Sequence, residues 1–151
     1  MDACASRTEI DIENGWTKLF RVTDNGVGIH EHELPFAFKR HGTSKIVNEG
    51  DFTSIKTFGF RGEALPSIAA VSRIVCTTRT EDVSSGSYIE ITNSKIENQG
   101  KQGAPSGTSI AVHNLFSDVP ARLKFLKTPK AEMAAIHRTV TKLALSAPTV
   151  G

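Results

Sequence analysis

The sequence predicts an α/β fold of the α+β kind, a two-layer sandwich in which a mixed, mostly antiparallel sheet carries its helices on one face. Apolar and polar residues alternate in residues 8–13 and again in 108–113, which is the period of a half-buried strand. Residues 73–80 are rich in β-branched side chains and predict a further strand. Residues 62–71 show helical apolar spacing, and residues 129–145 begin with a Pro that suits a first helical turn. Packing such helices on one sheet buries the apolar side of both.

The N-terminal part of the chain predicts a β-hairpin. Residues 2–6 are expected to be the last turn of a helix, and the strand at 8–13 follows. The Asn-Gly pair at 14–15 is typical of a tight hairpin turn, because both residue types tolerate a positive φ. Residues 16–23 then form the return strand, which delivers Asp24 to the end of a strand.

Short helices, loops and strands are expected along the rest of the chain. Residues 31–38 predict a short helix, since a Pro is tolerated in its first turns, and residues 39–48 predict a loop. A strand is expected at 88–92. The polar stretch 98–106 contains two Gly and a Pro and predicts a surface loop, and residues 119–126 predict another helix.

Length and composition fit one globular domain. The chain has 151 residues, of which 38% are hydrophobic and 23% charged. It contains no apolar run long enough to span a bilayer and no basic-then-apolar signal peptide. We therefore expect a cytoplasmic protein, or a nuclear one if the source is eukaryotic. Cys4 and Cys76 have no metal-ligand spacing and predict reduced thiols.

A first candidate binding motif is DNGVGI at residues 24–29. A carboxylate at a strand end, here Asp24, suits an exocyclic amino group such as that of adenine. Gly26 and Gly28 would let the backbone approach the base closely. An Asx turn that leads out of the strand explains the same residues about equally well.

A second candidate motif is GFRGEAL at residues 59–65. Its glycines precede a predicted helix, whose first N–H groups favour anions, and Arg61 adds a charge-assisted contact. The motif is neither a Walker P-loop nor a dinucleotide fingerprint. A glycine-rich helix cap, with Glu63 as the capping side chain, is the alternative interpretation.

Two weaker signals accompany these motifs. The loop GTSK at 42–45 offers two hydroxyls and an ammonium that would close over phosphates, although alone it predicts only a polar loop. Thr108 would hydrogen-bond to the base directly or through water, although a Gly-Thr pair is also an ordinary strand start. The run HEHE at 30–33 predicts a solvated helix start and no metal site, because His residues at i and i+2 face different sides of a helix.

Basic residues concentrate near the C-terminus. Residues 122–142 hold six Lys or Arg against Glu132 alone, a local net charge of +5. Such a segment attracts nucleic-acid phosphates, and Arg122, Lys124 and Lys127 are the candidate DNA contacts. A solvated helix face is the alternative interpretation for each of them.

Together these segments resemble the N-terminal ATPase domain of the MutL family of DNA mismatch-repair proteins, which includes the eukaryotic Mlh and Pms proteins. The family belongs to the GHKL group, with gyrase B, a heat-shock chaperone and histidine kinases, and that group shares the Asp-x-Gly-x-Gly element found here at 24–28. The segments TSKI at 43–46, GFRGEAL at 59–65, and LF followed by PARLKFL within 115–126 are specific to MutL-type proteins. The resemblance covers residues 2–147 and implies the Bergerat-type GHKL ATPase fold.

The resemblance implies a role for each motif. Asp24 would read adenine with Gly28 and Thr108, residues 43–45 would form a lid over the phosphates, and Arg61 with the amides that follow it would also hold phosphate. The resulting set of predicted nucleotide-binding residues is Asp24, Gly26, Gly28, Thr43, Ser44, Lys45, Gly59, Arg61, Gly62, Glu63, Ala64, Leu65 and Thr108.

The same resemblance implies the ligands and partners. ATP, with ADP as product, and Mg²⁺ are expected. ATP binding would order the lid and join two MutL-type subunits as a homodimer or heterodimer. That dimer would signal repair through DNA and a mismatch-recognition partner of the MutS type, with no membrane involved.

The chain departs from the family pattern at its start. The family's first motif runs Glu-x-x-x-Asn-Ser-x-Asp-Ala, and Asp2-Ala3 matches only its end. The general-base Glu and the Mg²⁺-binding Asn would precede Met1, and the second (S5-like) and C-terminal domains would follow Gly151. We therefore expect residues 1–151 to be a single GHKL ATPase domain without its catalytic helix. It would contain no catalytic residue or metal ligand, would bind nucleotide weakly and would not hydrolyse it.

Two other functions stay open at this stage. One alternative is that the chain is a non-catalytic module that binds DNA or a repair partner through residues 122–142. The other is that it belongs to a different GHKL protein, such as a kinase or a topoisomerase, although residues 43–46 and 120–126 argue against that.

Overall fold

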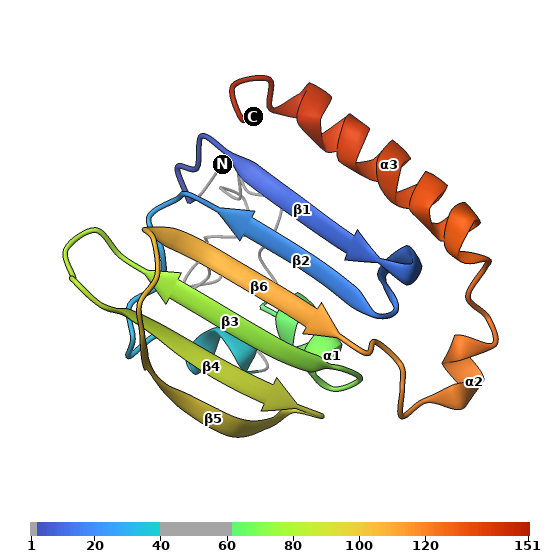
Figure 1. The fold of residues 1–151 in the computed structure, drawn as a ribbon, viewed down its shortest axis with the longest axis horizontal. Helices are drawn as coiled ribbons and strands as arrows, with labels where there is room; N and C mark the ends of the chain where they lie inside the picture. Colours follow the sequence, from blue (N-terminus) through green and yellow to red (C-terminus); the bar gives the residue numbers. More distant parts are fainter. Residues whose placement is uncertain (1–2, 40–61) are drawn as a thin grey trace, which may run out of the picture.

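A computed structural model describes residues 3–39 and 62–151, and these form one antiparallel sheet with helices around it (Figure 1). The strand order is β1-β2-β6-β3-β4-β5, and all neighbours pair antiparallel. The strands are β1 (Thr8–Glu13), β2 (Leu19–Asp24), β3 (Arg73–Arg79), β4 (Gly86–Thr92), β5 (Lys95–Gln102) and β6 (Gly107–His113). The predicted α+β class is confirmed, and β6 is central as expected, because it lies between β2 and β3.

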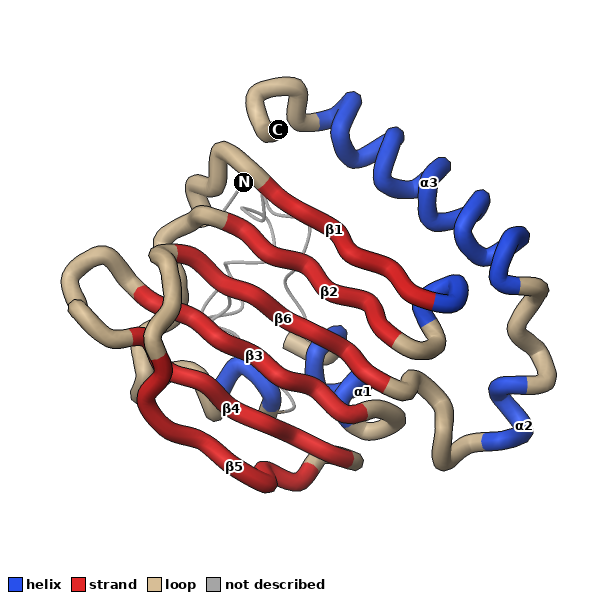
Figure 2. The backbone as a smooth tube through the Cα atoms, viewed as in Figure 1, coloured by secondary structure: helices blue, strands red, loops and turns tan. Residues whose placement is uncertain are grey.

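The helices lie on one face and along one edge of the sheet. They are the 3-10 helices η1 (Asn14–Trp16) and η2 (Phe36–Phe38) and the α-helices α1 (Ala64–Ala69), α2 (Pro120–Leu123) and α3 (Pro129–Ser146). Helix α1 lies behind the sheet in contact with η2, whereas α3 runs beside β1 (Figure 2). No helix formed by the described residues combines the length and hydrophobicity needed to cross a bilayer.

The core lies between the sheet and α1. Successive strand side chains point to opposite faces, so alternate residues of the central strands share the covered face. Ile74 and Cys76 of β3 are fully buried, as is Ile89 of β4. Ala69 of α1 and Leu34 belong to the same cluster. The sheet therefore has one covered face and one more open face.

The first hairpin differs from the predicted one. Residues 14–18 connect the strands, so β2 begins at Leu19, opposite Glu13, rather than at residue 16. Gly15 and Trp16 both have a positive φ, of 60° and 80°. A Cβ on Gly15 would lie 2.8 Å from the Cα of Pro129, so the start of α3 packs directly against this turn. That tertiary contact, rather than local turn preference, sets the longer connection.

The prediction of a surface loop at 98–106 is wrong for residues 98–102, which belong to β5. This strand pairs with β4 at the sheet edge, with an irregularity between Glu90 and Ile91. Almost every β5 residue is exposed, so neither face required apolar side chains and the period-two signal is missing. Residues 103–106 do form a loop.

Three predicted helical segments are shorter than expected or not helical. Residues 31–38 form turns and only the 3-10 helix η2, and the helix predicted at 119–126 is reduced to α2. Residues 3–6 contain no helix. Instead the Ala3 carbonyl accepts from the Val27 amide at 2.9 Å, and the Asn25 side chain accepts from the amides of residues 6 and 7. Bonds to the 25–27 segment thus replace those of a helix.

Candidate functional site

A row of polar side chains crosses the covered face at one end of the sheet. Asp24 of β2 is the cross-strand partner of Thr108 on β6, Thr108 is the partner of Thr78 on β3, and Thr78 is the partner of Ser87 on β4. Direct partners lie side by side on one face. Thr78 and Ser87 are 1% and 6% exposed. Four polar groups therefore replace apolar ones at the end of the core.

Asp24 has one carboxylate oxygen engaged and one available. Its Oδ1 accepts a hydrogen bond from the Gly26 amide at 2.8 Å, which is the Asx turn considered as an alternative above. Its Oδ2 accepts no hydrogen bond from residues 3–39 or 62–151. Asp24 shares a face of the sheet with Thr108 and Thr78. Burial, and then the charge of Asp24, raise the pKa of the Cys76 thiol to about 12. An ionised carboxylate only accepts, and Oδ2 is thus suited to a donor.

The glycines of the 24–29 motif are packed closely against the protein's own backbone. A Cβ on Gly26 would lie 2.3 Å from the Ala3 carbonyl oxygen. Gly28 has a φ of +76°, and its Cβ would lie 2.3 Å from the Arg79 carbonyl oxygen. Protein backbone occupies these positions, so the glycines let the loop pack against residue 3 and the end of β3.

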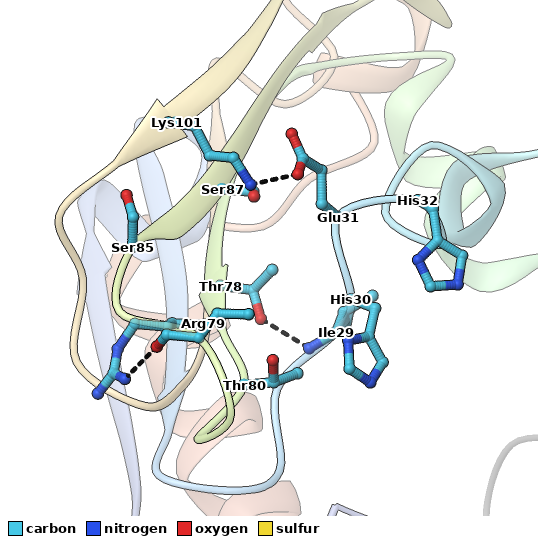
Figure 3. A pocket seen from close by; sticks show the side chains of 11 residues that line it. Ile29, His30, Glu31, His32, Thr78, Arg79, Thr80, Ser85, Ser87 and Lys101 are labelled. Carbon is cyan, nitrogen blue, oxygen red and sulfur yellow. Dashed lines mark hydrogen bonds and ion pairs between the residues drawn. The ribbon is translucent and has the colours of Figure 1, made fainter.

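Thr78 links this loop to β6 and was not predicted as a site residue. Its Oγ1 accepts from the Ile29 amide at 2.9 Å (Figure 3) and donates to the Gly107 carbonyl at 2.9 Å. It also lies 3.0 Å from Oγ1 of Thr108. One feature of the sequence could have identified Thr78 as a candidate: it places a hydroxyl at a core-facing position of β3, two residues after Cys76.

Arg79 hydrogen-bonds to two loops at this end of the sheet, the β3–β4 connection and the β5–β6 connection. Its Nε donates to the Ala104 carbonyl at 2.6 Å, and its terminal nitrogens donate to the Val83 carbonyl at 2.9 Å and to Oγ of Ser106 at 2.7 Å. The Arg79 guanidinium therefore holds the segment that leads into Gly107 against the β3–β4 connection.

Two pockets flank the segment that follows Asp24. One, of about 180 Å³, lies beside Ile29 and Thr78, and an ion pair between Glu31 and Lys101 lies at its edge (Figure 3). The other, of about 560 Å³, is lined by Gly26 and Gly28 together with Cys4, Asn25, Val27, His30, Glu33, Thr80, Glu81 and Asp82.

The His30–Glu33 run does not form the predicted helix start. The rings of His30 and His32 stack with their centroids 5.6 Å apart, which a turn allows and a helix does not. Within the described ranges, no three His, Cys, Asp or Glu side chains are grouped so that they could hold a metal ion.

The predicted phosphate residues are only partly described. Gly62 has a φ of +61°, and Glu63 precedes α1, which begins at Ala64 rather than at Gly62. Glu63 is the N-cap residue of this helix, as in the alternative interpretation, but its side chain makes no capping hydrogen bond. Leu65 is half-buried in its first turn. Thr43, Ser44, Lys45, Gly59 and Arg61 lie outside the described residues.

The candidate DNA contacts lie at the opposite end of the sheet. Strand β6 runs from Thr108, beside Asp24, to His113, and α2 follows that far end (Figure 1). The Arg122 guanidinium lies over the Phe116 ring at 5.5 Å. Lys124 and Lys127 are exposed, and their neighbour Phe125 is 88% exposed. The structure therefore separates the basic residues from Asp24.

Known proteins that resemble this chain are mismatch-repair proteins. No protein-family model matches it. The chain is 44% identical over 150 residues to the DNA mismatch repair protein MutL of Streptococcus pyogenes, and 45% identical over 148 residues to MutL of Acidobacterium capsulatum. These matches cover 99% and 98% of the chain, but only 23% and 22% of the two relatives.

Solved structures extend the likeness to the fold. The ATPase domain of Aquifex aeolicus MutL complexed with ADP matches with a TM-score of 0.77 and 31% identity. The match covers 99% of this chain and 51% of that one. A second structure of this Aquifex domain gives a TM-score of 0.73 at 28% identity. The chain thus belongs to the MutL family of DNA mismatch-repair proteins, and its fold is that of the MutL ATPase domain, a member of the GHKL group.

Proposed function

We propose that this chain binds ATP and ADP, with the adenine amino group held at Asp24, as the nucleotide-binding part of a mismatch-repair protein. The carrying observation is that Asp24 and Thr108 are cross-strand partners, and that Oδ2 of Asp24 accepts no hydrogen bond from the described residues. The ADP complex of the similar Aquifex domain supports a purine nucleotide as the ligand.

The phosphates would be held by the two segments that the resemblance identifies. Residues 43–45 would form the lid, and Gly59, Arg61 and residues 62–65 would line the phosphate side. Gly62 has a positive φ, and Glu63 and Ala64 are exposed at the start of α1, so the backbone here is open to solvent. We propose that these two segments form the phosphate-binding part of the site.

Binding without appreciable hydrolysis is the activity we propose for residues 1–151. These residues include Asp2-Ala3 from the end of the family's first motif, but neither its Glu nor its Asn. A general base must lie within hydrogen-bond reach of the attacking water. We assign neither a general base nor a Mg²⁺ ligand to residues 1–151. Phosphate release that depends on the purified chain would contradict this part of the proposal.

The whole protein would couple this site to repair. ATP would order the lid and bring two MutL-type subunits together in the cytoplasm, or the nucleus of a eukaryote, and the dimer would act on DNA with a MutS-type partner. The support is the family alone, because the chain spans less than a quarter of the Streptococcus relative.

Calorimetric titration of Mg²⁺-free ADP tests the adenine site. An Asp24→Asn variant retains an Oδ1 for the Gly26 amide but turns Oδ2 into a donor that opposes the adenine amino group. We expect ADP to bind about 10- to 100-fold more weakly, since hydrogen bonds to charged groups contribute about 1.5–3 kcal/mol.

The matched control is Asp11→Asn. Asp11 lies on β1, and its Oδ2 is 3.6 Å from Nη1 of Arg21 on the open face of the sheet. It should leave ADP binding unchanged. Equal binding by wild type and Asp24→Asn would refute the adenine assignment, and so would equal losses in the two variants.

A second candidate function is DNA or partner binding through the basic segment. The observation in its favour is that Lys124 and Lys127 are exposed around the almost fully exposed Phe125. A double Lys124→Glu, Lys127→Glu variant tests it more cleanly than Arg122, whose side chain packs over Phe116. DNA affinity should fall steeply and the slope of its salt dependence should decrease, while ADP binding stays unchanged. DNA binding that the double variant leaves intact would remove this candidate.

A further inference from the structure

The Thr78 hydroxyl makes three hydrogen bonds in a buried position. The side chain is 1% exposed, and its Oγ1 contacts the Ile29 amide, the Gly107 carbonyl and the Thr108 hydroxyl at 2.9–3.0 Å. A hydroxyl has one proton to donate and two lone pairs that accept. All of the hydrogen-bonding capacity of Thr78 is therefore used inside the protein.

The protons can be assigned from these contacts. The Gly107 carbonyl cannot donate, so the Thr78 proton goes to it. The Ile29 amide can only donate, and it occupies one lone pair of Thr78. The remaining lone pair can accept only from Thr108, which places the Thr108 proton on Thr78. Thr108 then has only lone pairs left for a ligand.

This polarity matters because of the neighbour of Thr108. Oδ2 of Asp24, the cross-strand partner, is also an acceptor. Two acceptors side by side match an amino group, which has two protons to give. Guanine has a carbonyl oxygen where adenine has its amino group, and that oxygen would face two acceptors.

We propose that Thr78 is a positioning residue of the nucleotide site, which fixes Thr108 as an acceptor and thereby favours adenine over guanine. The inference rests on the proposed function of the Asp24–Thr108 pair. Thr78 also ties the backbone after Gly28 to β3 through the Ile29 amide. One buried hydroxyl thus sets both the hydrogen-bond polarity of the base site and the position of the loop beside it.

The test compares ADP and GDP binding by calorimetry in the 151-residue chain. Thr78→Val keeps the shape and removes the hydroxyl, whereas Thr78→Ser keeps the hydroxyl. The matched control is Thr77→Val, since Thr77 is adjacent on β3 but faces the other side of the sheet.

We expect Thr78→Val to bind ADP about 10-fold more weakly, the typical effect of one lost buried hydrogen bond. The preference for ADP over GDP should shrink by a similar factor, because Thr108 can then donate to a carbonyl. Thr78→Ser and Thr77→Val should behave as wild type.

Equal losses for ADP and GDP, or no loss, in folded Thr78→Val would overturn the proposal. If Thr78→Val does not fold, two wild-type measurements decide. Rapid hydrogen exchange of the Ile29 amide, or equal affinity for ADP and GDP, would each contradict the assigned bonds. ADP binding that Asp24→Asn leaves intact would instead refute the proposed function, so the two failures are distinguishable.

Discussion

Gly107 lies directly against the backbone of Asp24, so that a Cβ on Gly107 would be 2.0 Å from the Asp24 carbonyl oxygen. Gly107 also has a φ of +114°, which residues with a side chain rarely adopt. Because β6 begins at Gly107, this contact sets where β6 meets β2. Thr108 is thereby placed beside Asp24.

A Gly107→Ala substitution should therefore destabilise the fold. The added methyl group forces β6 away from Asp24 and strains the backbone, and we expect a loss of about 2–4 kcal/mol in the free energy of unfolding. Urea unfolding followed by circular dichroism measures it. Gly103→Ala is the matched control, because a Cβ there would meet nothing within 4 Å, and it should change stability by less than about 0.5 kcal/mol. Similar losses in both variants would contradict the packing described.

Strand and helix positions followed from the sequence where side-chain periodicity was strong. Apolar–polar alternation predicted β1 and β6, and the β-branched residues of β3 predicted that strand. Strand β5 has almost no buried side chain, so its sequence shows no such alternation. The hairpin connection was set by the contact of Gly15 with Pro129, which lies far along the chain. Local residue preferences do not contain that information.

The site was predictable only in part. Residues 24–29 and Thr108 form recognisable motifs, and the structure brings Asp24 and Thr108 together. Thr78 belongs to no motif and was missed, because its importance arises from contacts with Ile29 and Gly107 that form only in the folded sheet. The packing of Gly28 against Arg79 was likewise not predictable, since Arg79 is distant in sequence.

Cys76 should make stability fall at alkaline pH. Burial, and secondarily the charge of Asp24, raise the pKa of its thiol to about 12 from a reference of 9.0. Between these values the unfolded chain loses the proton and the folded chain keeps it. The free energy of unfolding should therefore decrease as pH rises through this window, with a slope approaching about 1.4 kcal/mol per pH unit. Urea unfolding between pH 8 and about 10.5 tests this part of the window.

The comparison that isolates the thiol is Cys76→Ala against Cys4→Ala. Cys4 is exposed, so its substitution should preserve the alkaline slope, whereas Cys76→Ala should reduce it. Aromatic-disulfide labelling of native wild type should modify Cys4 and spare Cys76 until unfolding. An unchanged slope in Cys76→Ala would show that other groups cause the alkaline loss.

His113 should make stability fall on acidification. Burial lowers the pKa of this imidazole below 6.5, and the nearby Arg73 and Arg21 lower it further. The unfolded chain then takes up a proton that the folded chain resists, so the free energy of unfolding should decrease as pH falls from about 6.5 through the lowered pKa. His113→Gln should flatten this dependence. An NMR titration that places the His113 pKa at or above 6.5 in the folded chain would contradict the prediction.

Helix α3 should open more readily than the sheet. None of its residues is buried, and a groove of about 280 Å³ is lined by Ile10 and Ile12 of β1 and by Met133, Ile136 and Val140 of the helix. The helix is attached at its start, where Pro129 packs on Gly15, and the segment after it is held where Gly151 hydrogen-bonds to the backbone of Ser6 and Thr8. By contrast, β3 and β6 are each paired on both sides. Segments with few buried contacts open at lower free energy than core strands.

Hydrogen exchange followed by mass spectrometry measures this difference. Peptides from α3 should exchange at least about 10-fold faster than peptides from β3 and β6, because opening the helix leaves the core between the sheet and α1 intact. The β1 peptide should be intermediate, since β2 is the one strand of the described sheet that pairs with it. Equal protection of α3 and β3 would mean that helix and sheet open only together, and that the groove beside β1 does not weaken the attachment of the helix.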